Sequence, residues 1–131
     1  MIALDTSSIV AYLTGENGAD VEMVDNALSG EYALLPPVVL TELRSDPKLE
    51  PKVRTLIAGL PLMELHEGYW ERVGKTRATL FQRKLKARLA DALIAQSCID
   101  HRMPLVTRDS DFRHFVRYCG LRLVTETWTL S

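Results

Sequence analysis

Met1-Ile2-Ala3-Leu4-Asp5-Thr6-Ser7-Ser8 is the stretch that indicates how the fold is built. Its second to fourth residues form a short apolar run, as in a buried strand, and Asp5 closes that run. Hydroxyl side chains follow at once, and these residue types are preferred at the start of a helix. The stretch therefore predicts a buried strand that leads directly into a helix.

Apolar runs and helical patterns alternate along the rest of the chain. Further strands are predicted at residues 32–35, 62–63, 105–106 and 121–124. Helices are predicted over residues 21–28, 36–43, 51–58, 67–83, 89–101 and 112–116, and residues 125–131 are expected to be a tail. Strands that alternate with helices favour a mostly parallel sheet covered on both faces. We therefore expect an α/β fold, a three-layer α/β/α sandwich around a sheet of about five strands.

Length and composition narrow the class of protein. With 131 residues, of which 47% are hydrophobic and 25% charged, the chain is expected to form one globular domain over residues 1–131. Its longest nearly apolar stretch, residues 32–40, contains two prolines and falls well short of the roughly 20 residues that a membrane helix needs. The first residues lack the basic lead of a signal peptide, so a cytoplasmic location is expected.

The cysteine content argues against two further classes. Cys98 and Cys119 are the only cysteines, and they form no C-x-x-C pair. A zinc site or a disulfide framework would need more cysteines than this. We expect both thiols to be reduced and buried.

The charge of the chain is segregated. The net charge of −1 argues against a protein that coats nucleic acid non-specifically. Residues 1–50 carry a net charge of −7, however, whereas residues 51–131 carry +6. The span from residue 72 to residue 90 holds seven bases and no acid. A run of this kind is commonly a solvated helix face, and it is also what a phosphate-binding surface needs.

Four acids are expected at one edge of the predicted sheet. Asp5 closes the first strand, and Asp109 lies three residues past Val106, which ends the fourth. Glu42 lies about two turns into the helix after the second strand, and Asp91 lies in the first turn of the helix before the fourth. The carboxyl ends of parallel strands meet at one edge, where ligands of open α/β folds bind. The four carboxylates should therefore converge.

Each of these acids also has a purely structural interpretation. Asp5 and Asp109 could cap helices, Asp91 could favour a helix amino end through the macrodipole, and Glu42 could be a surface glutamate. Several carboxylates held together in apolar surroundings repel one another unless a cation is present. Oxygen-rich pockets of three or four carboxylates are what Mg²⁺ or Mn²⁺ requires. The convergence of all four acids favours a metal site.

Four segments carry a resemblance to a known family. They are Met1-Ile2-Ala3-Leu4-Asp5-Thr6-Ser7, Val38-Val39-Leu40-Thr41-Glu42-Leu43, Ala90-Asp91-Ala92-Leu93-Ile94-Ala95 and Leu105-Val106-Thr107-Arg108-Asp109-Ser110-Asp111-Phe112. In order and spacing they resemble the PIN-domain ribonucleases and, more narrowly, the VapC-type toxins of prokaryotic toxin–antitoxin pairs. The last two segments, which begin at Ala90 and Leu105, are the more specific to this family. Between residues 46 and 88 only the helix pattern matches.

The resemblance implies a metal-dependent endoribonuclease in which Asp5, Glu42, Asp91 and Asp109 are the catalytic, metal-binding acids. It implies Mg²⁺ or Mn²⁺ as cofactor, with a metal-activated water hydrolysing the phosphodiester bond.

The resemblance also bears on residues around the quartet. The hydroxyls of Thr6, Ser7 and Thr107 occupy positions that support the acids in similar proteins, although helix capping and strand ending would also explain them. Asp111 is an extra acid that either assists the metal or caps the following helix.

Three partners follow from the resemblance. They are an RNA substrate, a cognate VapB-like antitoxin and a second copy of the chain in a homodimer. An antitoxin arginine is expected to bind Glu42 or Asp5 and to compete with the metal. The apolar helices near residues 38–43 and 56–60 are expected to form a groove for the rest of its tail.

The basic residues nearest the predicted acids are candidates for RNA binding. They are Arg83, Lys84, Lys86 and Arg88, which precede the Asp91 helix, and Arg108 and Arg113, which flank Asp109. The three histidines, His66, His101 and His114, fall on unrelated predicted elements, which argues against a metal-free ribonuclease with paired histidines.

Two other functions are weighed against the ribonuclease. An aspartate-based phosphoryl-transfer enzyme would use Asp5 as a covalent nucleophile, but that family has a second aspartate two residues on, where this chain has Ser7. A non-catalytic PIN-like module that only binds RNA or a partner would leave the complete acidic quartet unexplained.

Overall fold

The computed structural model describes residues 1–124. Its centre is a parallel sheet of three strands in the order β2-β1-β3, with β1 (Ile2–Leu4) between β2 (Ala33–Leu34) and β3 (Leu105–Val106). All three residues of β1 are buried. A central strand buried on both faces is typical of a parallel sheet that helices cover.

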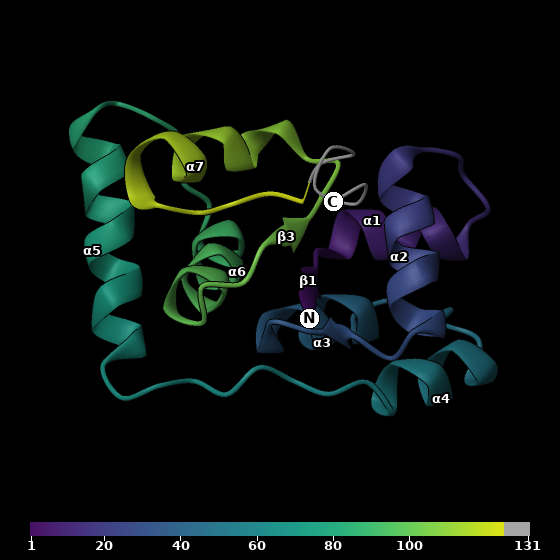
Figure 1. Ribbon diagram of the computed structural model, residues 1–131. Coiled ribbons are helices and arrows are strands. Elements are labelled where there is room, and N and C mark those ends of the chain that lie inside the picture. The colour runs from purple at the N-terminus through teal and green to yellow at the C-terminus, as the bar shows by residue number, and fades with distance from the viewer. Residues whose placement is uncertain (125–131) are drawn as a thin grey trace.

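Seven α-helices surround the described sheet. Their bounds are α1 Thr6–Leu13, α2 Ala19–Ser29, α3 Pro37–Arg44, α4 Pro51–Ala58, α5 Tyr69–Gln82, α6 Leu89–Asp100 and α7 Arg113–Cys119, and a 3₁₀ turn, η1, spans Ser110–Phe112. Figure 1 shows α1 and α2 on one side of β1, and α5, α6 and α7 on the other. The prediction of an α/β fold with a parallel sheet flanked by helices is confirmed.

The predicted number of about five strands is wrong in one respect. The segments at 62–63 and 121–124 do lie at the two edges of the sheet, but each contributes a single parallel bridge, Leu62 to Leu35 and Leu123 to Leu105. Leu35 donates its N–H to the Pro61 carbonyl and accepts from the Met63 N–H. Extending this ladder backwards would need an N–H from Pro61, which proline lacks. The predicted tail, residues 125–131, lies outside the described residues.

Glycine explains where two predicted helix ends move. The helix expected over residues 67–83 begins at Tyr69, because Gly68 takes a left-handed conformation with φ of 83°. The helix expected over 112–116 runs on to Cys119 and ends at Gly120, which is again left-handed with φ of 86°. The helix over residues 51–58 and its stop at Gly59 are confirmed.

The interior is apolar, with few polar side chains. Phe112, Phe115 and Leu4 are among its largest fully buried residues. The buried polar residues in the described chain are Asp5, Ser8, Gln96 and Ser97, and no buried side-chain N or O atom there lacks a hydrogen-bond partner.

Both cysteines are free, as expected. Cys98 is buried, but Cys119 is only partly buried, so that half of the prediction is corrected. Within residues 1–124 no helix has the length and apolar character needed to cross a membrane.

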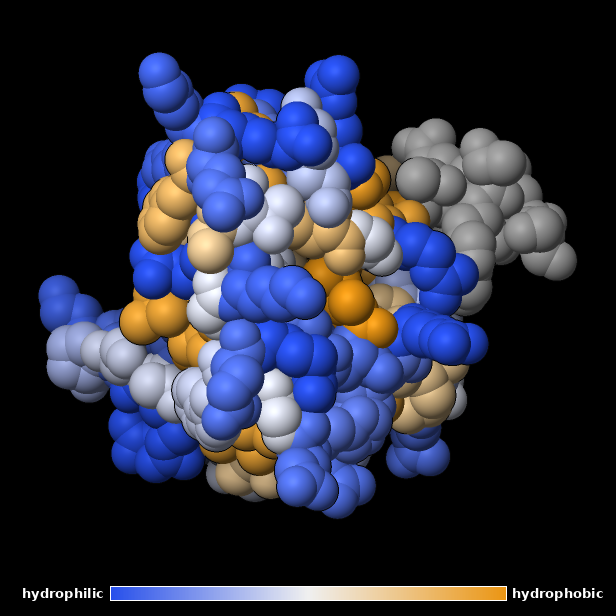
Figure 2. All heavy atoms as spheres, turned by 90° about the vertical axis from the view of Figure 1, so that its left-hand side faces the viewer, coloured by the Kyte–Doolittle hydropathy of each residue, from blue (hydrophilic) through white to orange (hydrophobic). Residues whose placement is uncertain are grey.

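The outer face of α5 is more apolar in places than a solvated helix needs. Figure 2 looks onto the α5 side of the molecule and shows hydrophilic side chains interrupted by separate apolar patches. Trp70 and Phe81, both on α5, are exposed over 65% and 51% of their surface.

Candidate metal centre and its basic rim

Asp5 lies where β1 passes into α1. It is only 4% exposed and caps α1, accepting a hydrogen bond from the Ser7 backbone N–H. The same carboxylate oxygen, Oδ2, accepts from the Ser7 hydroxyl and, at 2.8 Å, from the Thr107 hydroxyl. The capping interpretation of Asp5 is therefore correct, and it does not exclude a role in the site.

Glu42 reaches this region from α3. The Thr6 hydroxyl donates to Glu42 Oε1 at 2.7 Å. Because Thr6 directly follows Asp5, this hydrogen bond ties the α3 carboxylate to the end of β1. Glu42 is partly buried.

Thr107 connects two of the acids. Its hydroxyl donates to Asp5 and accepts from the Asp109 backbone N–H at 3.0 Å. The Ser7 and Thr107 hydroxyl oxygens are 3.3 Å apart. All three hydroxyls proposed from the sequence, on Thr6, Ser7 and Thr107, thus contact an acid of the quartet, and they orient those acids.

Three further carboxylates gather on the α6 side of β3. Asp91, Asp109 and Asp111 each offer a carboxylate oxygen, and these oxygens lie within 4.8 Å of one another. Asp109 Oδ1 also accepts from the Asp111 N–H at 2.9 Å, so Asp109 caps η1. We call the five acids Asp5, Glu42, Asp91, Asp109 and Asp111 the acidic cluster.

The electrostatics couple the two halves of the acidic cluster. Burial, together with the charges of Asp109 and Asp5, raises the pKa of Asp91 to about 6, while Arg88 opposes the rise. Burial also raises the pKa of Asp5, against the lowering effect of the Ser7 and Thr107 hydrogen bonds, and Glu42 adds to the rise. Burial is thus the main cause of both shifts, and neighbouring acids add to it.

The donor set of the acidic cluster fits a hard divalent cation. The metal-ligand grouping found in residues 1–124 consists of the carboxylates of Asp91, Asp109 and Asp111, with no histidine or cysteine, and it does not include Asp5 or Glu42. Mg²⁺ and Mn²⁺ prefer such oxygen ligands. Burial and the charges of Asp109 and Asp5 disfavour the carboxylate form of Asp91, and a bound cation would offset that cost.

Three of the predicted basic residues converge on one member of the acidic cluster. Asp111 Oδ2 lies 3.1 Å from Lys86 Nζ and 3.6 Å from an Arg88 guanidinium nitrogen, and Asp111 Oδ1 lies 3.9 Å from an Arg113 nitrogen. The hydrogen bond from Lys86 holds the pKa of Asp111 below its usual value. We call Lys86, Arg88 and Arg113 the basic rim.

The other predicted bases are placed differently. The Arg108 guanidinium makes two hydrogen bonds to Asp20, at 2.8 and 2.9 Å, and one to the Asn17 carbonyl. Asp20 also accepts from the Ser8 hydroxyl. Arg108 thus braces the loop after β3 against the start of α2.

The two bases just after α5 do not contact the acidic cluster through any ion pair found in residues 1–124. The Arg83 guanidinium lies 4.1 Å from the centre of the Tyr118 ring. Lys84 is exposed, with a left-handed backbone at φ of 60°.

The histidines are not all on unrelated parts of the fold. The rings of His66 and His101 lie 4.3 Å apart between centroids, and one nitrogen of His101 contacts the Glu64 carbonyl. The expectation from the sequence is wrong here, because only the packing of the loop before α5 against the end of α6 brings these rings together.

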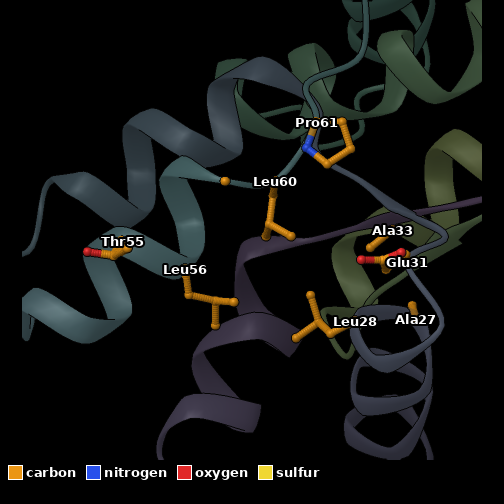
Figure 3. A pocket seen from close by; sticks show the side chains of 9 residues that line it. Ala27, Leu28, Glu31, Ala33, Thr55, Leu56, Leu60 and Pro61 are labelled. Carbon is orange, nitrogen blue, oxygen red and sulfur yellow. The ribbon is translucent and has the colours of Figure 1, made fainter.

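Two pockets flank α4. One of about 380 Å³ lies between α2, β2 and α4, and Figure 3 shows Leu28, Leu56 and Leu60 directed into it. The other, of about 210 Å³, lies between α1, α3 and α4 and includes Glu42 and Leu43. The first contains no member of the acidic cluster, whereas the second reaches it through Glu42.

Comparison with known proteins finds one family and several similar structures. A family model for the PIN domain matches residues 2–118. VapBC2 from Rickettsia felis, bound to a DNA fragment from its promoter, gives a TM-score of 0.70 at 22% identity over 95% of this chain and 98% of the other. FitAcB from Neisseria gonorrhoeae gives 0.70 at 22% identity, over 95% and 97%.

A third similar structure is VapBC-5, a member of the VapBC family of toxin–antitoxin systems from Mycobacterium tuberculosis. It gives a TM-score of 0.65 at 19% identity over 94% of this chain and 96% of the other. No curated protein matches in sequence. At these identities the structural likenesses establish a shared fold.

Proposed function

Because this chain belongs to the PIN-domain family, we propose that it is a metal-dependent endoribonuclease and the toxin of a toxin–antitoxin pair. The observation that carries the proposal is the acidic cluster itself. Carboxylate oxygens of Asp91, Asp109 and Asp111 lie within 4.8 Å of one another, and burial together with the charges of Asp109 and Asp5 raises the pKa of Asp91. The similar structures include members of VapBC systems, which supports the toxin half of the proposal.

The proposed metal ligands are Asp5, Glu42, Asp91 and Asp109, and the proposed cofactor is Mg²⁺ or Mn²⁺. When bound, such a cation supplies positive charge to a phosphodiester and makes water a better nucleophile. No nucleophilic side chain is then required.

The chain's own residues do the positioning in this proposal. Thr6 fixes the carboxylate of Glu42, and Ser7 and Thr107 fix that of Asp5, so these acids need little reorganisation when charge develops. The basic rim offers exposed cations to the phosphates of a single-stranded or loop RNA.

A phosphoryl-transfer enzyme with Asp5 as nucleophile is less compatible with this geometry. Asp5 is 4% exposed, and its Oδ2 already accepts hydrogen bonds from Ser7 and Thr107. A covalent nucleophile must reach a phosphorus atom in line, and burial together with the hydrogen bonds to Oδ2 makes this less favourable for Asp5. A module that binds RNA without cleaving it is distinguished by the activity test below.

Cleavage of a labelled single-stranded RNA tests the enzymatic proposal. We expect cleavage with Mg²⁺ or Mn²⁺, none in excess EDTA, and none by Asp91→Asn. Glu22→Gln is a matched control, because Glu22 is exposed on α2 and makes no ion pair within residues 1–124. RNA binding without cleavage by the wild-type chain would instead support the non-catalytic module.

We further propose that an antitoxin tail occupies the pocket that includes Glu42. Its apolar lining includes Leu43, Leu49 and Val53, and Glu42, Asp46 and Glu50 give it acidic edges. This suits a segment with an apolar side chain and an arginine. Of the two acids expected to receive that arginine, Glu42 is the better placed, since Asp5 is buried.

The pocket between α2, β2 and α4 extends the proposed tail site towards Leu56 and Leu60. Leu56→Asp should weaken co-purification with the antitoxin encoded next to this gene while leaving RNA cleavage intact. Leu62→Asp is the matched control, because Leu62 is exposed over 45% of its surface, like Leu56 at 44%, but does not line the pocket. Equal loss in both variants would contradict this docking site.

Toxicity and self-association are tested in cells and in solution. The wild-type chain expressed alone in the cytoplasm should arrest growth, Asp5→Asn should not, and the antitoxin should restore growth. We also propose a homodimer, which light scattering of the purified chain tests directly. Harmless expression of a folded chain with verified nuclease activity would rule out the toxin role.

A further inference from the structure

We propose that Asp111 is a positioning residue that gathers the basic rim into a binding subsite for an RNA phosphate next to the metal centre, and that it is not a metal ligand. The inference rests on the proposed ribonuclease function. The sequence left two roles open for Asp111, assisting the metal or capping a helix, and the inference replaces both with one.

The ion pairs around Asp111 are the first observation. Its Oδ2 faces Lys86 at 3.1 Å and Arg88 at 3.6 Å, and its Oδ1 faces Arg113 at 3.9 Å. Three cations share one carboxylate, so the group keeps an excess of positive charge. The carboxylate reduces the repulsion between three like charges that lie close together.

The exposure of these side chains shows that the cations remain available. Lys86, Arg88 and Arg113 have exposed side-chain fractions of 52%, 61% and 61%, whereas that of Asp111 is 25%. An ammonium has three donors and a guanidinium five, so contact with one carboxylate leaves donors free for a phosphate.

The backbone holds two of the cations in place. Lys86 and Arg88 flank Ala87, which is 3% exposed and whose carbonyl accepts a hydrogen bond from Arg77 Nε at 3.0 Å. With Ala87 anchored inward, its two neighbours are directed outward. Arg88 is also the N-cap residue of α6, the helix that carries Asp91. The cations are therefore fixed relative to a proposed metal ligand.

The position of Asp111 beside the proposed metal centre is the fourth observation. One of its carboxylate oxygens lies within 4.8 Å of oxygens of Asp91 and Asp109, and its N–H donates to Asp109. A phosphate bound by the basic rim would thus be close to the proposed cleavage point, as the neighbour of the scissile phosphate along one RNA strand.

The same proximity would allow Asp111 to be a metal ligand, and the ion pairs argue against it. The charge of this carboxylate is already shared among three cations at 3.1 to 3.9 Å, so it has less to offer a metal. Asp91 and Asp109 form no ion pair among those found in residues 1–124, so they are free to bind a cation.

Titration with Mg²⁺ or Mn²⁺ alone, followed by calorimetry, separates the two roles without any cleavage. We expect Asp111→Asn to keep the metal affinity of the wild-type chain to within about twofold, and Asp109→Asn to lose at least about tenfold, the scale of one 1.4 kcal/mol interaction. A loss in Asp111→Asn as large as that in Asp109→Asn would overturn the proposal.

Binding of a fluorescent single-stranded RNA in EDTA is the second readout. Simple removal of a negative charge would tighten RNA binding, whereas loss of positioning should weaken it and flatten its salt dependence. Each lost phosphate contact should reduce the slope of log K against log salt by about 0.7. Unchanged or tighter binding by Asp111→Asn would contradict the positioning role.

A double-mutant comparison completes the test. Lys86→Gln with Arg88→Gln should raise KM several-fold with little change in kcat, and adding Asp111→Asn should have little further effect, because the three act as one unit. Lys75→Gln, an exposed lysine on α5 with no ion pair within residues 1–124, is the control. Should Asp111→Asn fail to fold, the Lys86–Arg88 pair of substitutions decides: an unchanged salt slope would overturn the subsite.

Failure of the subsite and failure of the proposed nuclease activity can be told apart. If the chain binds RNA through the basic rim but never cleaves it, the subsite stands and the ribonuclease proposal fails. If it cleaves RNA but Asp111→Asn loses the metal, the ribonuclease stands and the subsite fails.

Discussion

Asp5 and Glu42 are held by neutral hydroxyl groups, whereas Asp111, at the other end of the acidic cluster, is held by three cations. Hydroxyl donors orient the carboxylates of Asp5 and Glu42 without bringing a positive charge to them. Cations neutralise as well as orient, so Asp111 has less negative charge to offer a metal, while the three cations around it keep a net positive charge that attracts phosphate. In the proposed function, this difference separates the acids that would bind the metal, Asp5, Glu42, Asp91 and Asp109, from Asp111, whose cations would bind RNA.

The largest effect on RNA cleavage should come from removing a proposed metal ligand or the metal itself. Asp91→Asn, or excess EDTA, should lower the rate of RNA cleavage by at least about 100-fold, the scale seen when a group that stabilises transition-state charge is lost. Initial rates on a labelled single strand measure this. Activity that survives in EDTA would mean that the carboxylates do not act through a metal.

Removing one of the hydroxyls that hold Asp5 should lower the cleavage rate by a smaller factor. Thr107→Val deletes the donor to Asp5 and the acceptor for the Asp109 N–H. A hydrogen bond to a charged group contributes roughly 1.5–3 kcal/mol, so we expect the cleavage rate to fall by about tenfold or more. The pKa of Asp5, which this hydrogen bond lowers, should rise, and the pH–rate profile should shift upward.

Thr79→Val is the control for this substitution. Thr79 lies on α5, and its hydroxyl donates only to the Lys75 carbonyl of the same helix. Its replacement should leave both the rate and the pH profile unchanged. Equal effects of the two substitutions would mean that Thr107 supports the fold rather than the acids.

The metal-free protein should become less stable as the pH rises through the range of Asp91 ionisation. The pKa of Asp91 is about 6 in the folded chain against an ordinary 3.8, so the folded state binds more protons than the unfolded state between these values. The free energy of unfolding should therefore fall from pH 4 to pH 6. After allowance for solvent screening we expect a change on the order of 1 kcal/mol.

Urea unfolding in EDTA at several pH values measures this change. Asp91→Asn should remove most of the pH dependence and should be at least as stable as the wild-type chain at pH 7.5. A clear loss of stability in Asp91→Asn would favour a structural role for that acid.

The smallest effect should come from substituting Arg108. This test asks whether Arg108 braces the fold, in contrast to the basic rim, which we propose binds RNA. Arg108→Gln removes two hydrogen bonds to Asp20 near the surface, and such pairs contribute roughly 0–1 kcal/mol. We expect a small loss of stability and no change in the salt slope of RNA binding. A flattened slope would place Arg108 in the RNA-binding surface after all.

Local sequence patterns predicted much of the fold because the interactions concerned are short in range. The cap of α1 joins Asp5 to Ser7, two residues away, and the cap of η1 joins Asp109 to Asp111. Helix α4 begins at Pro51 and is capped by Gly59, and each residue favours a helix end through its own backbone conformation. Local patterns did not predict that the segment at Leu62 forms only a single bridge. That outcome depends on the pairing of Pro61 and Leu62 with Leu35, which is distant in the sequence.

The sequence by itself determined that strands and helices alternate and that four acids lie at the carboxyl edge of a parallel sheet, because these follow from periodicity and from the direction of each strand. Tertiary structure decided which side chains meet. Thr107 reaches Asp5 across 102 positions, and Arg108 reaches Asp20 across 88. Arg108 precedes Asp109 in the sequence, yet it pairs with Asp20, and Lys86 pairs with the distant Asp111. These pairings are decided by how the elements pack and not by sequence proximity.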